Sequence, residues 1–162
     1  MSARNVTARH SSGERARARV ISARGASAVV AAAGLGIAGY LTVVHYAGAS
    51  PVCAISHGCA TVQQSRYAEL AGVPVALLGL AGYAAILASL ARDGEGARTL
   101  TAFLALSGFG FSAWLTYVEV ARLDAVCSWC VASAVCMTLL AVLSVKRVLD
   151  PAARCDVPAA PS

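Results

Sequence analysis

Four long apolar stretches dominate the pattern of hydrophobic and polar positions along the chain. They cover residues 26–46, 73–90, 99–120 and 126–145, and charged side chains are nearly absent from them. A helix of about 20 residues crosses the roughly 30 Å hydrocarbon core of a bilayer. Strands of a membrane barrel would alternate apolar and polar positions, which these stretches do not. The pattern predicts an all-α fold, an integral membrane bundle of four transmembrane helices.

The composition supports a membrane protein. Hydrophobic residues make up 58% of the 162 residues and charged residues 13%, whereas soluble domains carry about 25% charged residues. Disorder over most of the length is excluded, because disordered chains are poor in hydrophobic residues. The first stretch is too long for a signal peptide and three more follow it. We expect a basic cytoplasmic tail (1–25), a membrane domain (26–146) and a disordered cytoplasmic tail (147–162).

The net charge of +5 is unevenly distributed. Of the 13 Lys and Arg residues, only Arg66 and Arg122 lie in the first and third connections, residues 47–72 and 121–125. The other Lys and Arg residues are Arg4, Arg9, Arg15, Arg17, Arg19, Arg24, Arg92, Arg98, Lys146, Arg147 and Arg154. Because cytoplasmic segments carry the excess of Lys and Arg, we expect both termini to lie in the cytoplasm. The membrane is expected to be the inner or plasma membrane of the cell. No aromatic residues interleave with the tail arginines, so nucleic-acid binding is not expected.

Small and aromatic residues within the spans have simple structural interpretations. Gly34, Gly36 and Gly39 follow no strand, so we interpret them as sites where helices approach closely rather than as a dinucleotide loop. A roughly helical stripe, formed by Phe111, Trp114 and Tyr117, is expected to pack inside the bundle or, as the alternative, to form a pocket wall. Glu119 and Asp124 end the third stretch and are expected outside the membrane, where charge is well solvated.

Four of the six cysteines fall on the predicted outer face, in two pairs. Cys53 and Cys59 lie in the first outer connection, and Cys127 and Cys130 open the fourth stretch as Cys-Ser-Trp-Cys. Disulfides persist outside the cytoplasm. A thiol at a helix N-terminus favours the thiolate, the nucleophile of disulfide exchange. A disulfide closing so short a loop as Cys127–Cys130 stabilises little, so a redox role is favoured.

Other interpretations of the cysteines stay open. Four cysteines can form a tetrahedral zinc site, although the outer face is oxidising and the Cys53–Cys59 spacing is wider than a zinc knuckle. Cys53–Cys59 can also be a structural disulfide that stabilises the outer loop. Cys127 and Cys130 can also be small apolar residues without a redox role. Taken together, the pairs favour a relay that needs no metal. The outer pair meets a soluble partner, and the pair at the membrane edge passes two electrons to a lipid-soluble acceptor, a quinone.

The order of these motifs resembles a known family. The Cys-x5-Cys pair is followed after six residues by Ser65, then by Gly-Val-Pro-Val-Ala-Leu-Leu-Gly at residues 72–79 and by Cys-Ser-Trp-Cys. Over residues 26–145 the chain is similar to the bacterial homologues of vitamin K epoxide reductase. The resemblance implies a four-helix bundle around a quinone, menaquinone or ubiquinone. It also implies a separate DsbA-like thioredoxin-fold protein as the electron donor.

The resemblance also implies roles for individual residues. Cys53 and Cys59 take the shuttle role, Cys127 exchanges with a loop cysteine, and Cys130 faces the quinone ring. Ser65 caps the quinone pocket. From the residues alone, Ser65 can instead be the N-cap of a short helix that begins near Arg66.

The chain departs from the animal enzymes at two positions. Their Tyr four residues after the second motif cysteine is Ala134 here, and their Asn near the start of the second span is matched by Val75. These differences argue against epoxide as a substrate and leave the relay intact.

The alternatives are a vitamin K (epoxide) reductase, a DsbB-type enzyme and a non-catalytic four-span scaffold with structural disulfides. A DsbB-type enzyme would carry Cys-x-x-Cys in the first outer loop, and here the motif opens the fourth stretch.

Overall fold

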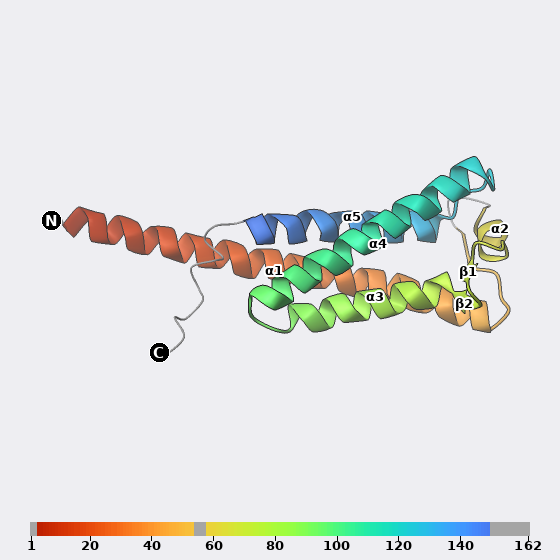
Figure 1. The fold of residues 1–162 in the computed structure, drawn as a ribbon, viewed down its shortest axis with the longest axis horizontal. Coiled ribbons are helices and arrows are strands. Elements are labelled where there is room, and N and C mark those ends of the chain that lie inside the picture. Colours follow the sequence, from red (N-terminus) through yellow and green to blue (C-terminus); the bar gives the residue numbers. More distant parts are fainter. Residues whose placement is uncertain (1–2, 54–57, 150–162) are drawn as a thin grey trace.

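The computed structural model describes residues 3–53 and 58–149, with side chains of the first helix described from residue 22 onward. Its elements are α1 (Ala3–Tyr46), α2 (Cys59–Gln63), β1 (Glu69–Leu70), β2 (Val73–Pro74), α3 (Val75–Leu90), α4 (Glu95–Ala121) and α5 (Ser128–Leu149). The fold is therefore mostly helical, as predicted (Figure 1). The predicted C-terminal tail lies outside the described residues from residue 150 onward, and α5 continues three residues past the predicted domain end.

The four long helices form a bundle in which each packs against two others. α1 contacts α3 and α5, and α4 contacts α5 and α3. One end of the bundle holds the N-terminal extension of α1, the α3–α4 turn and the end of α5, whereas α2, β1 and β2 cap the other end (Figure 1). At the first end Arg24 of α1 forms a salt bridge with Asp93 of the α3–α4 turn. Helix α1 begins at Ala3, so the predicted boundary at residue 25 is not a break in the helix.

Three of the helices are long and apolar enough to cross a membrane. Among the described residues these segments are Ser22–Tyr46, Glu95–Ala121 and Ser128–Leu149. Helix α3 is also apolar but has 16 residues, which corresponds to about 24 Å of helix. The predicted apolar stretches thus coincide with helices, and the second of them is shorter than expected.

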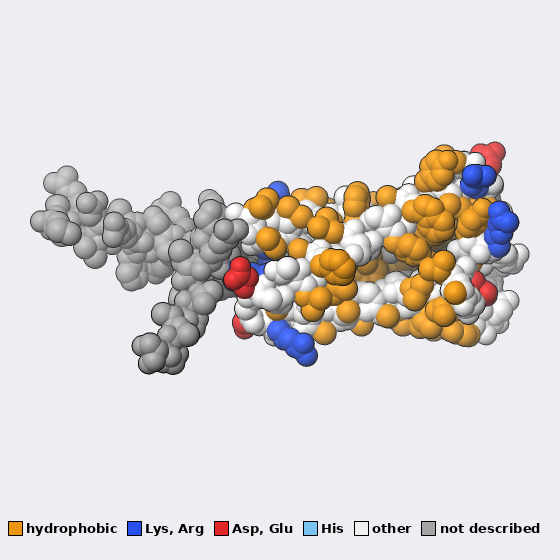
Figure 2. Space-filling model, in the orientation of Figure 1, with side chains coloured by type: hydrophobic (Ala, Val, Ile, Leu, Met, Phe, Trp, Pro, Cys, Tyr) orange, Lys and Arg blue, Asp and Glu red, His pale blue; other side chains and the backbone are white. Residues whose placement is uncertain are grey.

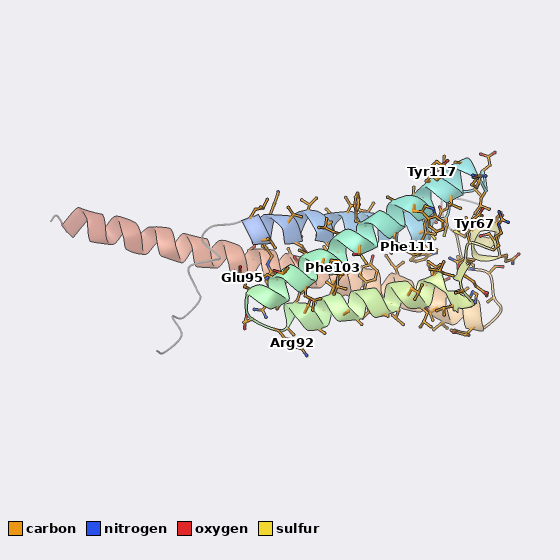
Figure 3. All side chains as sticks on the ribbon, viewed as in Figure 1. Tyr67, Arg92, Glu95, Phe103, Phe111 and Tyr117 are labelled. Carbon is orange, nitrogen blue, oxygen red and sulfur yellow. A yellow bond between two sulfur atoms is a disulfide. The ribbon has the colours of Figure 1, made fainter. Side chains whose placement is uncertain are left out.

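The surface of the bundle suits a lipid environment. Large apolar side chains are exposed along its middle, among them Phe103, Leu106, Val135 and Leu139. Figure 2 shows this apolar band with charged side chains gathered toward the two ends. Figure 3 shows Arg92 and Glu95 at the end that carries the α1 extension. Soluble monomers rarely expose continuous apolar surface of this extent.

The aromatic stripe of α4 does not pack inside the bundle as predicted. Trp114 is 44% exposed and Tyr117 60% exposed, while Phe111 lines an internal cavity. In a membrane the outer face of a helix is also apolar, so side-chain type does not distinguish the two faces.

Tyr83 of α3 packs in the interior between α1, α3 and α5. Its ring is fully buried and its hydroxyl donates to the carbonyl oxygen of Ser133 at 2.9 Å. A Cβ atom placed at Gly34 would lie 2.2 Å from a carbon of this ring, whereas at Gly36 it would meet no atom within 4 Å. The predicted close approach is therefore confirmed at Gly34 and wrong at Gly36, and a Cβ atom at Gly39 would make only an ordinary contact, 3.7 Å from Leu80.

The second apolar stretch begins as a strand rather than as a helix. Leu70 pairs with Val73 and Glu69 with Pro74 in a small antiparallel ribbon. Its turn uses Ala71 and Gly72, both with positive φ, as two-residue hairpins require. Helix α3 starts only after Pro74. Hydrophobicity alone does not separate a short apolar strand from the first turn of an apolar helix.

Candidate functional site at the capped end of the bundle

The Cys-Ser-Trp-Cys motif forms the first turn of α5. The backbone N–H of Val131 donates to the carbonyl oxygen of Cys127 at 3.0 Å, which makes Cys127 the N-cap residue. Cys130 lies at the end of this turn and has a hydrogen bond with the Cys127 sulfur. Both thiols are free, and Cys127 is completely buried.

The loop pair lies directly above this turn. Cys53 and Cys59 form a disulfide with a Cα–Cα distance of 6.2 Å. The Ser128 hydroxyl oxygen lies 3.6 Å from the Cys53 sulfur and 3.7 Å from the Cys59 sulfur. Cys59 is buried in one cluster with Cys127, whereas Cys53 is partly exposed. The structure thus brings the four predicted cysteines together at one end of the bundle.

Two contacts hold the loop against the start of α5. A Cβ atom at Gly58 would lie 2.6 Å from the backbone oxygen of Val126, so only glycine allows this approach. The indole Nε1 of Trp129 donates to the carbonyl oxygen of Val52 at 2.9 Å. The Trp129 ring also lies 4.9 Å from that of Tyr40 on α1. Trp129 therefore connects α5, α1 and the loop.

The environment of Cys127 favours its thiolate. The hydrogen bond from the Cys130 thiol lowers the pKa of Cys127 to about 7, against opposing effects of burial and of the Glu119 charge. The N-terminal position on α5 acts in the same direction, because the helix dipole stabilises negative charge there. A substantial fraction of Cys127 is then nucleophilic at neutral pH.

Glu119 is the site residue that the sequence interpretation missed. It was expected in solvent, yet it is 4% exposed. Its carboxylate Oε2 accepts the backbone N–H of Cys127 at 3.0 Å and forms a side-chain hydrogen bond with Cys130. The expectation fails because the last turns of α4 direct Glu119 inward, where the Cys127 backbone N–H replaces water as its hydrogen-bond partner. An ionisable residue near the end of a membrane span was itself a signal of a functional site.

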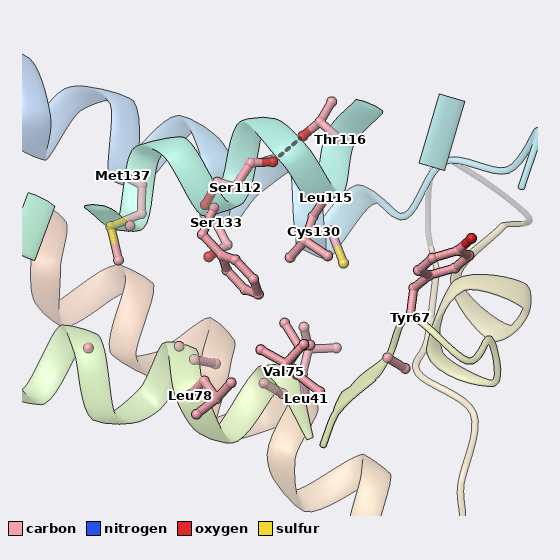
Figure 4. A pocket seen from close by; sticks show the side chains of 18 of the residues that line it. Leu41, Tyr67, Val75, Leu78, Ser112, Leu115, Thr116, Cys130, Ser133 and Met137 are labelled. Atoms are coloured by element: carbon pink, nitrogen blue, oxygen red, sulfur yellow. Dashed lines mark hydrogen bonds between the residues drawn. The ribbon is translucent and has the colours of Figure 1, made fainter. Parts of the chain in front are cut away.

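A cavity of about 410 Å³ lies between the helices beneath the motif. On α5 it is lined by Cys130, Ser133 and Met137, which share one helix face (Figure 4). Glu119 and Gln63 lie at the same end as Cys130, and the Gln63 amide nitrogen is 3.9 Å from the Cys130 sulfur. The remaining walls are mainly apolar residues of α1, α3 and α4.

Ser65 and Val75 also line this cavity. The Ser65 hydroxyl donates to the carbonyl oxygen of Val62 at 2.8 Å. The alternative in which Ser65 begins a helix near Arg66 is wrong, because α2 ends before Ser65 and no helix follows until α3 in the described chain. Ser65 closes the last turn of α2 instead.

The cavity fits a quinone better than a metal ion. Its volume and apolar walls match those of small-molecule sites. Polar side chains occur along its length, and Gln63 and Glu119 lie beside the Cys130 thiol at one end. Among the described side chains, no group of three or more His, Cys, Asp or Glu residues is arranged to hold a metal ion.

Comparison with known protein families gives a match. Residues 26–145, about three quarters of the chain, match the family model described as the Vitamin K epoxide reductase family. No curated protein matches the chain.

Proposed function

The chain belongs to the vitamin K epoxide reductase family, and from this premise we propose that it is a quinone-linked oxidoreductase that reoxidises a separate DsbA-like thioredoxin-fold protein. Family membership makes it a membrane oxidoreductase, as the order of motifs predicted. One observation carries the finer proposal. The loop disulfide and the motif thiols lie against each other, and Cys130 opens onto an apolar cavity.

In this proposal all four long helices cross the bilayer, with α3 as the shortest span. The end that carries the α1 extension and the α3–α4 turn faces the cytoplasm. The positions of Lys146 and Arg147 in the last turn of α5, at the same end, support this orientation. The cysteine pairs then face the oxidising side, where the thiol partner is found.

Electrons enter at the loop disulfide. The partner thiolate attacks Cys53, because its sulfur is partly exposed while that of Cys59 is buried. The Cys53–Cys59 bond breaks as a mixed disulfide forms with the partner. The second cysteine of the partner then attacks the sulfur of the partner's first cysteine in this mixed disulfide. The partner leaves oxidised, and the loop pair is left as two thiols.

Electrons next move between the two pairs. The Cys59 thiolate attacks the Cys127 sulfur of an oxidised motif pair, since both belong to one buried cluster. Cys130 leaves as a thiolate. Cys53 then attacks Cys59, which restores the loop disulfide and frees Cys127. The resulting state has an oxidised loop pair and two free motif thiols, the state of the sulfurs in the structure.

The motif thiols finally deliver their electrons in the cavity. A bound quinone supplies an acceptor for two electrons and two protons. Cys130 lies at the wall of the cavity, and Ser65 and Gln63 provide polar groups at the same end. The apolar walls exclude water from the reacting sulfur.

The test is quinone reduction by the purified protein with a reduced DsbA-like protein as donor. We expect Cys130→Ala to abolish turnover while the protein still inserts and retains the loop disulfide. Cys136→Ala is the matched control, because Cys136 is a free cysteine on the same helix that does not line the cavity. Full activity of Cys130→Ala would contradict the proposal. Turnover lost equally in both variants would show damage to α5 rather than loss of a reacting group.

A further inference from the structure

We propose that Glu119 is a catalytic proton carrier, which takes the proton of the Cys130 thiol and passes it to the reduced quinone. The inference rests on the proposed function and adds a residue to it. It starts from the position of Glu119 between the motif and the cavity. The carboxylate contacts the Cys127 backbone and the Cys130 side chain, and it lines the same cavity.

A purely structural role does not require an acid at this position. The hydrogen bond to the Cys127 N–H needs one acceptor oxygen, which a glutamine also offers. Burying a carboxylate costs much more than burying an amide. Glu119 is nevertheless 4% exposed in a largely apolar region. The property that distinguishes an acid from an amide here is the ability to take up and release a proton.

The other neighbours of Cys130 do not supply this property. Gln63 places an amide 3.9 Å from the Cys130 sulfur, and an amide does not titrate. Cys127 is the redox partner of Cys130 and bonds to it in the product. Among the described groups that contact Cys130, Glu119 is the carboxylate in reach of both the sulfur and the cavity.

The proposed step balances as follows. Two S–H bonds break and one S–S bond forms, so that two electrons and two protons pass to the quinone. The Cys130 sulfur keeps the electron pair of its S–H bond, and its proton moves to the Glu119 carboxylate. Glu119 then gives this proton to a quinone oxygen and returns to the ionised state. The second proton comes from the Cys127 thiol, or from water where Cys127 is already a thiolate.

The experiment measures two rates on the full-length protein with reduced motif cysteines. The first is single-turnover reduction of a short-chain benzoquinone. The second is alkylation of Cys127 at fixed pH without quinone, followed by mass spectrometry. For Glu119→Gln we expect quinone reduction to fall at least about 100-fold, the lower range for general acid–base groups. Alkylation of Cys127 should be unchanged or faster, because the Glu119 charge raises the pKa of Cys127.

Two further variants make the comparison specific. Asp124→Asn removes an exposed acid five residues away and should leave both rates unchanged. Glu119→Asp keeps a carboxylate and should reduce quinone at least tenfold faster than Glu119→Gln. Equal rates for these two Glu119 variants would contradict a proton carrier.

The outcomes separate this inference from the proposed function. Quinone reduction by Glu119→Gln within threefold of the wild type would overturn the assignment of Glu119 alone. A parallel fall of quinone reduction and Cys127 alkylation would also overturn it, because Glu119 would then only support the fold of the motif. A wild-type protein that does not reduce quinone would refute the proposed function, and the role of Glu119 with it.

Discussion

At the scale of single residues, the reactivity of the site depends on groups around the sulfurs. Cys127 combines a helix N-terminus with a hydrogen bond from Cys130, and the second of these lowers its pKa to about 7. The Ser128 hydroxyl contacts both loop sulfurs and so holds the disulfide next to this nucleophile. The site therefore places an activated thiol and an exchangeable disulfide within one cluster.

The pH dependence of Cys127 follows from this pKa. Only the thiolate reacts, so the alkylation rate should rise about tenfold per pH unit below 7 and level off above it. Removing the hydrogen bond by Cys130→Ala should move the midpoint upward, toward the value of about 8.5 for a free cysteine. The measurement is the alkylation rate of Cys127 between pH 5 and about 9. A wild-type midpoint at or above that of Cys130→Ala would contradict the assigned cause.

The sequence predicted the cysteines of the site but not their surroundings. Cys-x-x-Cys and Cys-x5-Cys are recognisable because their chemistry depends on residue type and local spacing. Glu119 was assigned to solvent because residue type and spacing do not report which way the last turn of α4 faces. Gly58 and Ser128 gave no signal either, since their contacts with Val126 and the loop disulfide come from packing between distant segments.

At the scale of elements, the helices and the C-terminal ends of the first three were predictable, whereas the starts were not. Each apolar stretch became a helix because a membrane-spanning backbone must satisfy its hydrogen bonds internally. The starts are set by local features that hydrophobicity does not report. Pro74 and the Ala71–Gly72 turn delay the start of α3, and Cys127 as N-cap fixes that of α5.

The packing of α1 on α3 gives a matched pair of glycine variants. Gly34→Ala forces a methyl group into the Tyr83 ring and should destabilise the protein by about 1–3 kcal/mol, as overpacking does. Gly36→Ala meets no atom within 4 Å and should be neutral or slightly stabilising. Thermal unfolding of both variants in detergent measures the difference. Equal midpoints for the two variants would show that α1 and α3 do not approach as closely as described.

At the scale of the whole molecule, the bundle separates two chemically different ends. The end that we propose to face the cytoplasm carries the Arg24–Asp93 salt bridge and the basic last turn of α5. The opposite end carries the four cysteines, where the proposed relay begins. In the proposed function this apolar band spans the bilayer, so that electrons would enter at the outer end and leave into the membrane.

This orientation predicts which cysteines an impermeant reagent reaches. After mild reduction of intact cells, a membrane-impermeant maleimide should label Cys53 and leave Cys155 of the C-terminal tail unlabelled. Cys155 should become reactive only after the cells are permeabilised, which serves as its internal control. Labelling of Cys155 in intact cells without labelling of Cys53 would reverse the orientation.

The central claim is that electrons pass between the two cysteine pairs within this chain, through Cys59 and Cys127. The most direct measurement is disulfide mapping by mass spectrometry of the double variant Cys53→Ala, Cys130→Ala, isolated from membranes with its thiols blocked. Neither remaining site cysteine then has its own partner. We predict a Cys59–Cys127 disulfide within one chain, since both sulfurs lie in one buried cluster. Recovery of both cysteines as free thiols would contradict the relay.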